Sequence, residues 1–126
     1  MGRILIVDDE IKVCSILKEY FSGRGYTAYT AVNGEEAIEK VKEVKPHVVL
    51  LDIIMPGIGG IDVLKKIKRL EPSTGVIMIT AIIDEELARE AIALGATDYI
   101  TKPFDLTHVE TVVMAKASDD VGIPAG

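Results

Sequence analysis

Four short segments of this 126-residue chain, three of them apolar runs, each end in side chains that could do chemistry. These side chains are carboxylates, a hydroxyl and an ammonium, and they belong to Asp8, Asp9, Asp52, Thr80 and Lys102. If the segments are strands of one parallel sheet, their carboxyl ends meet at a crevice, which is where such sheets bind ligands. The sequence therefore predicts one pocket that contains all five side chains.

Charge balance indicates what this pocket would bind. Three close carboxylates repel one another, and at least one must take up a proton unless cations compensate them. Lys102 supplies only one positive charge. A hard divalent cation would neutralise the rest, and oxygen ligands without a neighbouring His or Cys favour Mg²⁺ over zinc. Since Thr80 and Lys102 are suitable donors to phosphoryl oxygens, the pattern predicts phosphate chemistry with Mg²⁺ as cofactor.

Each residue taken alone also has an ordinary structural explanation. Asp8, Asp9 and Glu10 lie at a strand-to-helix junction, where an acid could cap the helix that follows. Asp52 could be a loop residue, and Lys102 could be a solvated surface lysine. Four predicted strand ends that all carry these residue types are improbable by chance, which favours a site. No glycine-rich phosphate loop follows residues 4–7, so nucleotide binding there is disfavoured.

The elements that must position these residues alternate along the chain. Three apolar runs at 4–7, 48–51 and 76–79 and two mixed segments at 27–32 and 98–100 predict five strands. Helical spacing, initial acids and closing glycines predict five helices, at 11–21, from 35 onward, at 61–70, at 84–94 and at 106–116. Strands that are apolar without alternation are buried on both faces, which requires helices on both sides. We therefore expect an α/β fold with a flavodoxin-like, doubly wound five-stranded parallel sheet of strand order 2-1-3-4-5.

Composition limits the organisation and the partners. The chain is 48% hydrophobic and 27% charged, as is typical of one folded domain. We expect that domain over residues 1–117 and a flexible tail or linker stub over 118–126. Twenty acidic against fourteen basic residues give a net charge of −6, which disfavours direct binding to nucleic acid. A single cysteine fits a reducing cytoplasm, and the apolar runs are too short to span a membrane.

Four segments of the chain together resemble the receiver domain of two-component response regulators. The segments are Ile6–Glu10, Leu50–Gly57, Ile79–Ala81 and Gly95–Phe104. The resemblance covers residues 3–117. It implies a phosphorylation-controlled switch rather than a turnover enzyme. A histidine kinase or phosphotransfer protein would donate the phosphoryl group, and an output partner or domain would respond.

The resemblance also implies roles for the acidic residues. Asp52 would be the phosphoacceptor and a metal ligand. Asp9 would be a direct ligand of Mg²⁺, and Asp8 would hold a metal-bound water. The backbone carbonyl of Ile54 would be the third protein ligand. The family has a cis peptide before the proline that follows Lys102.

Further residues would form the switch and the output face. Thr80 and Lys102 would bind the incoming phosphoryl oxygens, and Tyr99 resembles the aromatic switch residue. An ordinary half-buried strand aromatic remains the alternative for Tyr99. Output would pass through the helix at 84–94, the strand at 98–100 and the last helix. A phosphorylation-dependent homodimer is left open.

Hydrolysis of the aspartyl phosphate needs a positioned in-line water. By family analogy, Ile54 and Ile82 flank the path of that water. Neither apolar side chain can orient water through a hydrogen bond. We therefore expect slow self-dephosphorylation compared with relatives that have Asn, Gln or Glu at these positions.

Two other functions remain open from the sequence. An aspartate-nucleophile phosphohydrolase would turn over phosphomonoesters, but it would need a D-x-D motif where this chain has adjacent Asp8 and Asp9. A pseudo-receiver would be an interaction module that never accepts phosphate. The presence of Asp9, Asp52, Thr80 and Lys102 argues against that second alternative.

Overall fold

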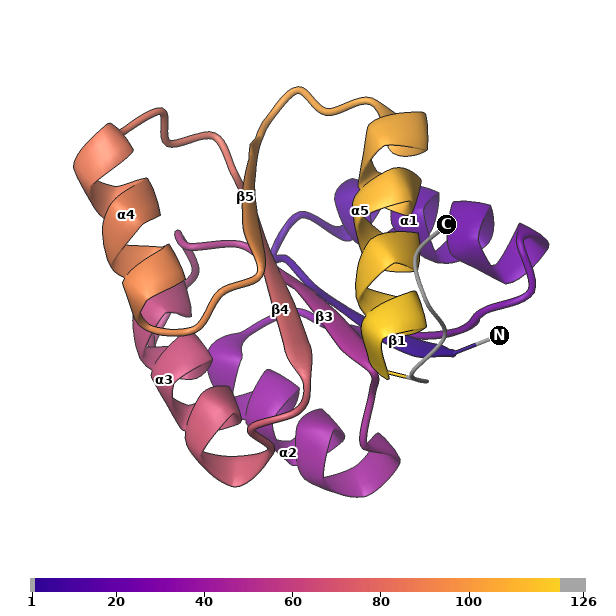
Figure 1. The fold of residues 1–126 in the computed structure, drawn as a ribbon, viewed down its shortest axis with the longest axis horizontal. Coiled ribbons are helices and arrows are strands. Elements are labelled where there is room, and N and C mark those ends of the chain that lie inside the picture. The colour runs from indigo at the N-terminus through magenta and orange to yellow at the C-terminus, as the bar shows by residue number, and fades with distance from the viewer. Residues whose placement is uncertain (1, 121–126) are drawn as a thin grey trace.

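The computed structural model describes residues 2–120, and within them five strands alternate with five helices (Figure 1). The strands are β1 (Arg3–Val7), β2 (Thr27–Ala31), β3 (Val48–Leu51), β4 (Gly75–Thr80) and β5 (Asp98–Thr101). The helices are α1 (Ile11–Gly23), α2 (Gly34–Val44), α3 (Gly60–Leu70), α4 (Glu85–Ala93) and α5 (Leu106–Asp120). This order of elements is the one that the sequence predicts.

One parallel sheet joins the five strands in the order β2-β1-β3-β4-β5. The observed order confirms the predicted flavodoxin-like, doubly wound architecture. Val7 pairs with Leu51, and Thr80 pairs with Thr101. Because these pairs are the last residues of their strands, the residues that follow β1, β3, β4 and β5 all lie at one end of the sheet. We call this end the carboxyl edge.

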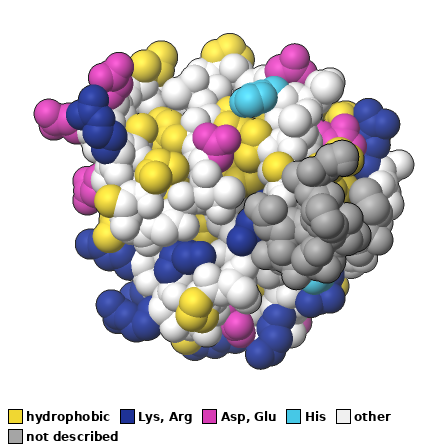
Figure 2. Space-filling view, viewed as in Figure 1, with side chains coloured by type: hydrophobic (Ala, Val, Ile, Leu, Met, Phe, Trp, Pro, Cys, Tyr) yellow, Lys and Arg dark blue, Asp and Glu magenta, His cyan; other side chains and the backbone are white. Residues whose placement is uncertain are grey.

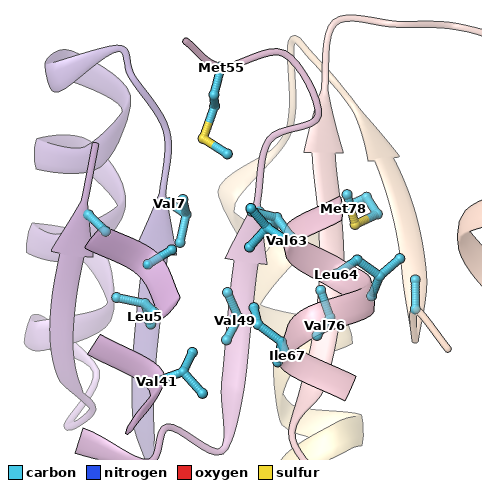
Figure 3. Close-up of a cluster of buried hydrophobic side chains, with 14 of the residues drawn as sticks. Leu5, Val7, Val41, Val49, Met55, Val63, Leu64, Ile67, Val76 and Met78 are labelled. Atoms are coloured by element: carbon cyan, nitrogen blue, oxygen red, sulfur yellow. The ribbon is translucent and has the colours of Figure 1, made fainter. Parts of the chain in front are cut away.

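Two hydrophobic clusters hold the helices on opposite faces of the sheet. On one face, Leu5 and Val7 of β1 pack with side chains of α2, α3 and α4 (Figure 3). On the other face, Ile4 and Ile6 pack with side chains of α1 and α5. These four residues are at most 1% exposed, and burying each such side chain stabilises the fold by about 1.5–3 kcal/mol. Both faces of β1 must therefore be apolar, which explains why Ile4–Val7 is an unbroken run of apolar residues.

Side-chain caps determine where two helices begin. Asn33 Oδ1 accepts a hydrogen bond from the Glu36 amide at the start of α2. Asp84 Oδ1 accepts from the amides of Glu86 and Leu87 at the start of α4. A cap of this kind contributes about 1 kcal/mol. Because the helices begin at the carboxyl edge, these caps also define the loops that surround it.

The C-terminal helix is longer than predicted. α5 continues to Asp120, past the predicted end at Lys116 and into the segment predicted as a tail. The residues after Lys116 contain no glycine or proline before Gly122, so no residue there interrupts the helix. Residues 121–126 of the predicted tail lie outside the described residues.

Candidate functional site

Lys102 lies at the carboxyl edge, and three carboxylates surround its ammonium. Lys102 Nζ lies 2.8 Å from Asp8 Oδ2, 3.0 Å from Glu10 Oε1 and 3.1 Å from Asp52 Oδ2. An ammonium has three N–H groups, so these three hydrogen bonds use all of them. The structure therefore brings Lys102, Asp8 and Asp52 into one cluster and adds Glu10, which is not among the predicted site residues.

The sheet itself positions the base of this cluster. The Asp52 amide donates to Val7 O at 3.0 Å, and the Lys102 amide donates to Thr80 O at 2.8 Å. Both bonds extend the strand ladder by one residue beyond the strand ends. The side chains of Asp52 and Lys102 therefore start from a rigid part of the backbone. The peptide between Lys102 and Pro103 is cis, as the family resemblance implies.

A close approach of two backbone segments explains a glycine beside the site. A Cβ on Gly60 would collide with the backbone carbonyl oxygen of Asp52. The Gly60 amide donates to Ile53 O at 2.8 Å, which closes the loop between β3 and α3. Only glycine allows α3 to begin so near the end of β3. This packing fixes the backbone that carries Asp52.

The two buried carboxylates are held in the same way. Asp8 Oδ1 accepts from the Glu10 amide at 2.9 Å, and Asp52 Oδ1 accepts from the Ile54 amide at 3.3 Å. The second oxygen of each carboxylate faces Lys102. The Asp8 side chain is 4% exposed and that of Asp52 is 7% exposed, whereas that of Glu10 is 62% exposed. The cluster therefore has two preorganised members and one solvated member.

The surroundings raise the pKa values of both Asp8 and Lys102, which disfavours the charged form of Asp8 but favours that of Lys102. Burial raises the pKa of Asp8 above its ordinary value, and the hydrogen bond from Lys102 offsets this only in part. Burial alone would lower the pKa of Lys102, but its hydrogen bonds to Asp8, Glu10 and Asp52 outweigh this and raise it. Lys102 is therefore firmly protonated. One ammonium facing three carboxylates gives the ionised cluster a net negative charge.

The carboxylates fit a divalent cation. One oxygen from each of Asp8, Glu10 and Asp52 lies within 4.8 Å of the other two. Oxygen-only ligands with excess negative charge are the donor set that Mg²⁺ prefers. Asp9, the predicted direct ligand, is exposed and is not one of these three residues. Its role as a ligand stays a prediction, as does that of the Ile54 carbonyl.

Glu10 is the site residue that sequence reasoning missed. Its position at a strand-to-helix junction predicts only a helix cap. Glu10 does occupy the N-cap position of α1, but its side chain makes no capping hydrogen bond. It contacts Lys102 instead. No sequence signal shows whether the Glu10 side chain caps α1 or contacts Lys102, because an acid in that loop can do either.

Thr80 and Tyr99 both contact the loop that follows β4. Thr80 is fully buried, and its Oγ1 accepts from the Ile82 amide at 3.4 Å. The Tyr99 hydroxyl donates to Ile82 O at 2.8 Å. The Tyr99 ring is half-buried against the hydrophobic cluster shared with α2, α3 and α4, and burial raises the pKa of its hydroxyl. The backbone of Ile82 therefore connects the two residues that the family resemblance assigns to the switch.

Comparison with known proteins gives consistent matches. The response regulator receiver domain matches residues 4–114. Chemotaxis protein CheY of Thermotoga maritima is 43% identical over 108 residues, which cover 85% of this chain and 90% of that protein. Regulatory protein AtoC of Escherichia coli is 42% identical over 113 residues, which cover 90% of this chain but only 24% of AtoC. This chain is thus similar both to a protein of its own size and to one part of a longer regulator.

A solved structure agrees over nearly the whole chain. The CheY-like response regulator receiver domain protein from Methanospirillum hungatei superposes with a TM-score of 0.93 at 27% identity. The match covers 98% of this chain and 99% of that one. The two chains therefore share the same arrangement of strands and helices.

Proposed function

Since this chain belongs to the response regulator receiver domain family of two-component systems, we propose that Asp52 is its phosphoacceptor. One observation carries the proposal. A buried carboxylate and a protonated lysine lie 3.1 Å apart at the carboxyl edge, within a cluster that has excess negative charge. Such a cluster has the charge to hold a divalent cation and the ammonium to receive a phosphoryl group.

The proposed reaction transfers a phosphoryl group from a phosphohistidine of a sensor kinase or phosphotransfer protein. An oxygen of Asp52 forms a bond to phosphorus, and the bond between phosphorus and the donor nitrogen breaks, with its electron pair remaining on nitrogen. The Lys102 ammonium then donates to a phosphoryl oxygen instead of to Asp52. The Thr80 hydroxyl lies at the neighbouring strand end and binds a second phosphoryl oxygen. Transfer of this kind depends mainly on positioning and charge neutralisation.

Mg²⁺ is the proposed cofactor of this transfer. Asp8, Asp9 and Asp52 would hold it, together with the backbone carbonyl of Ile54. Bound there, it would neutralise the carboxylates and the phosphoryl oxygens. Its requirement is tested by adding a chelator to the labelling reaction described below.

The signal would leave through the face formed by α4, β5 and α5. Figure 2 shows hydrophobic side chains exposed between α4 and α5 on this side of the molecule. Tyr99 of β5 contacts Ile82 O, so movement of the loop after Thr80 would change the surroundings of that ring. Phosphorylation can shift the balance between two conformations only by its different contacts in each. The partner on this face would be an output protein, an output domain or a second phosphorylated copy.

The setting we propose for this switch is the cytoplasm. None of the helices within residues 2–120 is both long and apolar enough to cross a bilayer. The free cysteine, Cys14, is buried in the cluster that α1 and α5 share. A free thiol is typical of a protein in a reducing compartment.

Labelling of Asp52 tests the proposal. The purified chain is incubated with acetyl phosphate and Mg²⁺, and the phosphoryl adduct is measured by intact-protein mass spectrometry. Wild type should gain one acid-labile phosphoryl group, and Asp52→Asn should gain none, because its amide cannot act as the nucleophile. Asp62→Asn on α3 is the matched control, since Asp62 is exposed and its ion pair is with Lys65 rather than with Lys102.

Three outcomes would contradict the proposal. Full labelling of Asp52→Asn would show that another residue accepts the phosphoryl group. No labelling of wild type at any Mg²⁺ concentration would favour the pseudo-receiver alternative. Continuous release of phosphate from a generic phosphomonoester, with no stable adduct, would favour the phosphohydrolase alternative.

A further inference from the structure

Glu10 is the member of the cluster that the proposed reaction does not yet use. Its backbone amide donates to Asp8 Oδ1 at 2.9 Å, which ties the start of α1 to the buried carboxylate. Its side chain leaves the helix uncapped and reaches Lys102 Nζ at 3.0 Å. An uncapped helix N-terminus is a cost to stability. The Glu10 side chain therefore contacts Lys102 rather than the first turn of α1.

The three carboxylates that contact Lys102 differ in how freely they can change their binding partners. Asp8 and Asp52 are almost completely buried, and each has one oxygen fixed by a backbone amide. Their other oxygens, which face Lys102, are the ones available to a cation or, at Asp52, to phosphorus. Glu10 is 62% exposed and can remain with the ammonium or return to water. When the two aspartates engage their ligands, Glu10 is the carboxylate of the three that stays available to Lys102.

We propose that Glu10 is a positioning residue, which holds the Lys102 ammonium at the mouth of the cluster during phosphoryl transfer. This inference rests on the proposed function above. A lysine side chain has a flexible four-carbon stem, and each rotamer that it samples away from the phosphoryl group lowers the transfer rate. Glu10 restricts that freedom from the solvent side. It touches neither phosphorus nor donor in this role and acts only through Lys102.

The test measures the phosphorylation rate against Mg²⁺ concentration, with acetyl phosphate as donor. Glu10→Gln keeps the shape but loses the charge, and Glu10→Ala removes the acceptor altogether. We expect the plateau rate at saturating Mg²⁺ to fall roughly three- to tenfold, the effect of one hydrogen bond, and to fall further in the alanine variant. Glu19→Gln, an exposed glutamate of α1 outside the cluster, is the control for net charge and should match wild type.

The shape of the curve separates a positioning residue from a metal ligand. If the plateau rate of Glu10→Gln equals that of wild type and only the Mg²⁺ concentration required is higher, Glu10 holds the cation and the inference is wrong. An unchanged or faster plateau in both variants also overturns it. Thermal unfolding near the wild-type temperature verifies that the variants are folded. If wild type itself is never labelled, the proposed function fails; if wild type and variants are labelled equally fast, only this inference fails.

Discussion

Two networks of charged side chains link distant parts of this chain, and they are built differently. At the carboxyl edge, Lys102 faces three carboxylates. Between α1 and α5, the Tyr20 hydroxyl donates to Glu110 Oε1 at 2.7 Å and accepts from Arg24 Nη2 at 3.0 Å. Arg24 Nε lies 3.4 Å from Glu110 Oε2, which closes that second network. We call the first the Lys102 cluster and the second the Arg24 network.

The difference lies in their charge balance. The Arg24 network has one cation for one anion, and its two contacts with Glu110 join the C-terminal end of α1 to α5. It stabilises the position of a helix. The Lys102 cluster has one cation for three anions, and burial raises the pKa of its Asp8. A buried group whose charged form is disfavoured is a cost to the fold. The balanced Arg24 network thus stabilises the packing of two helices. The unbalanced Lys102 cluster retains the negative charge that can bind a cation and the ammonium that can bind a phosphoryl group.

Removal of Lys102 should have the largest effect on stability. Lys102→Met keeps the length of the side chain but leaves the carboxylates without their cation. The free energy of unfolding should fall by about 3 kcal/mol in the absence of divalent cations, since breaking a buried ion pair leaves an uncompensated charge. Excess Mg²⁺ should restore part of that loss, because it binds the folded state. Urea denaturation with and without Mg²⁺ measures both quantities.

A lysine of α1 provides the control for this substitution. Lys12 is exposed, so Lys12→Met should change the free energy of unfolding by less than about 0.5 kcal/mol, with no greater response to Mg²⁺ than wild type. Equal stability of the two variants would contradict the contrast drawn between the networks.

Breaking the Arg24 network should lower the free energy of unfolding by a smaller amount, and Mg²⁺ should not change that loss. Glu110→Gln weakens its contacts with Tyr20 and Arg24, and Glu110 is only 16% exposed. We expect a loss of about 1 kcal/mol in the free energy of unfolding. Glu43→Gln, at an exposed position of α2, is the matched control. Rescue of Glu110→Gln by Mg²⁺ would mean that the two networks are coupled, contrary to our expectation.

The smallest effect on stability is expected for the apolar residues beside the Lys102 cluster. Ile54 is 61% exposed, and Ile82 is half-buried. Replacing either with Asn should speed decay of the phosphorylated form by at least about threefold, because the amide can orient water with a hydrogen bond. Stability should hardly change. The measurement is the loss of the phosphoryl adduct with time after the donor is removed.

Ile83 provides a neighbouring control for that measurement. It is 84% exposed and lies next to Ile82, so Ile83→Asn introduces the same amide one position further along the loop. Its phosphoryl decay should match that of wild type. Equal rates in all three variants and in wild type would refute the idea that apolar residues at 54 and 82 extend the lifetime.

The sequence alone determined the architecture. Unbroken apolar runs such as Ile4–Val7 require burial on both faces, so the alternation of strands and helices leaves few topologies. The observed order β2-β1-β3-β4-β5 is the predicted one. The same reasoning placed Asp8, Asp52 and Lys102 at one edge, because residues that follow parallel strands must emerge together. These predictions depend on strand periodicity and direction, which are local properties.

Only the tertiary structure decided the features that depend on side-chain direction outside the strands. Asp9 and Glu10 are adjacent exposed acids in one loop, yet Glu10 and not Asp9 joins Asp8 and Asp52 around Lys102. A loop has no fixed period, so spacing cannot choose between them. The contact between Tyr20 and Glu110 joins residues 90 positions apart, and no local pattern encodes it. The direction of a loop side chain and the pairing of distant helices are fixed by packing, which exists only once the chain has folded.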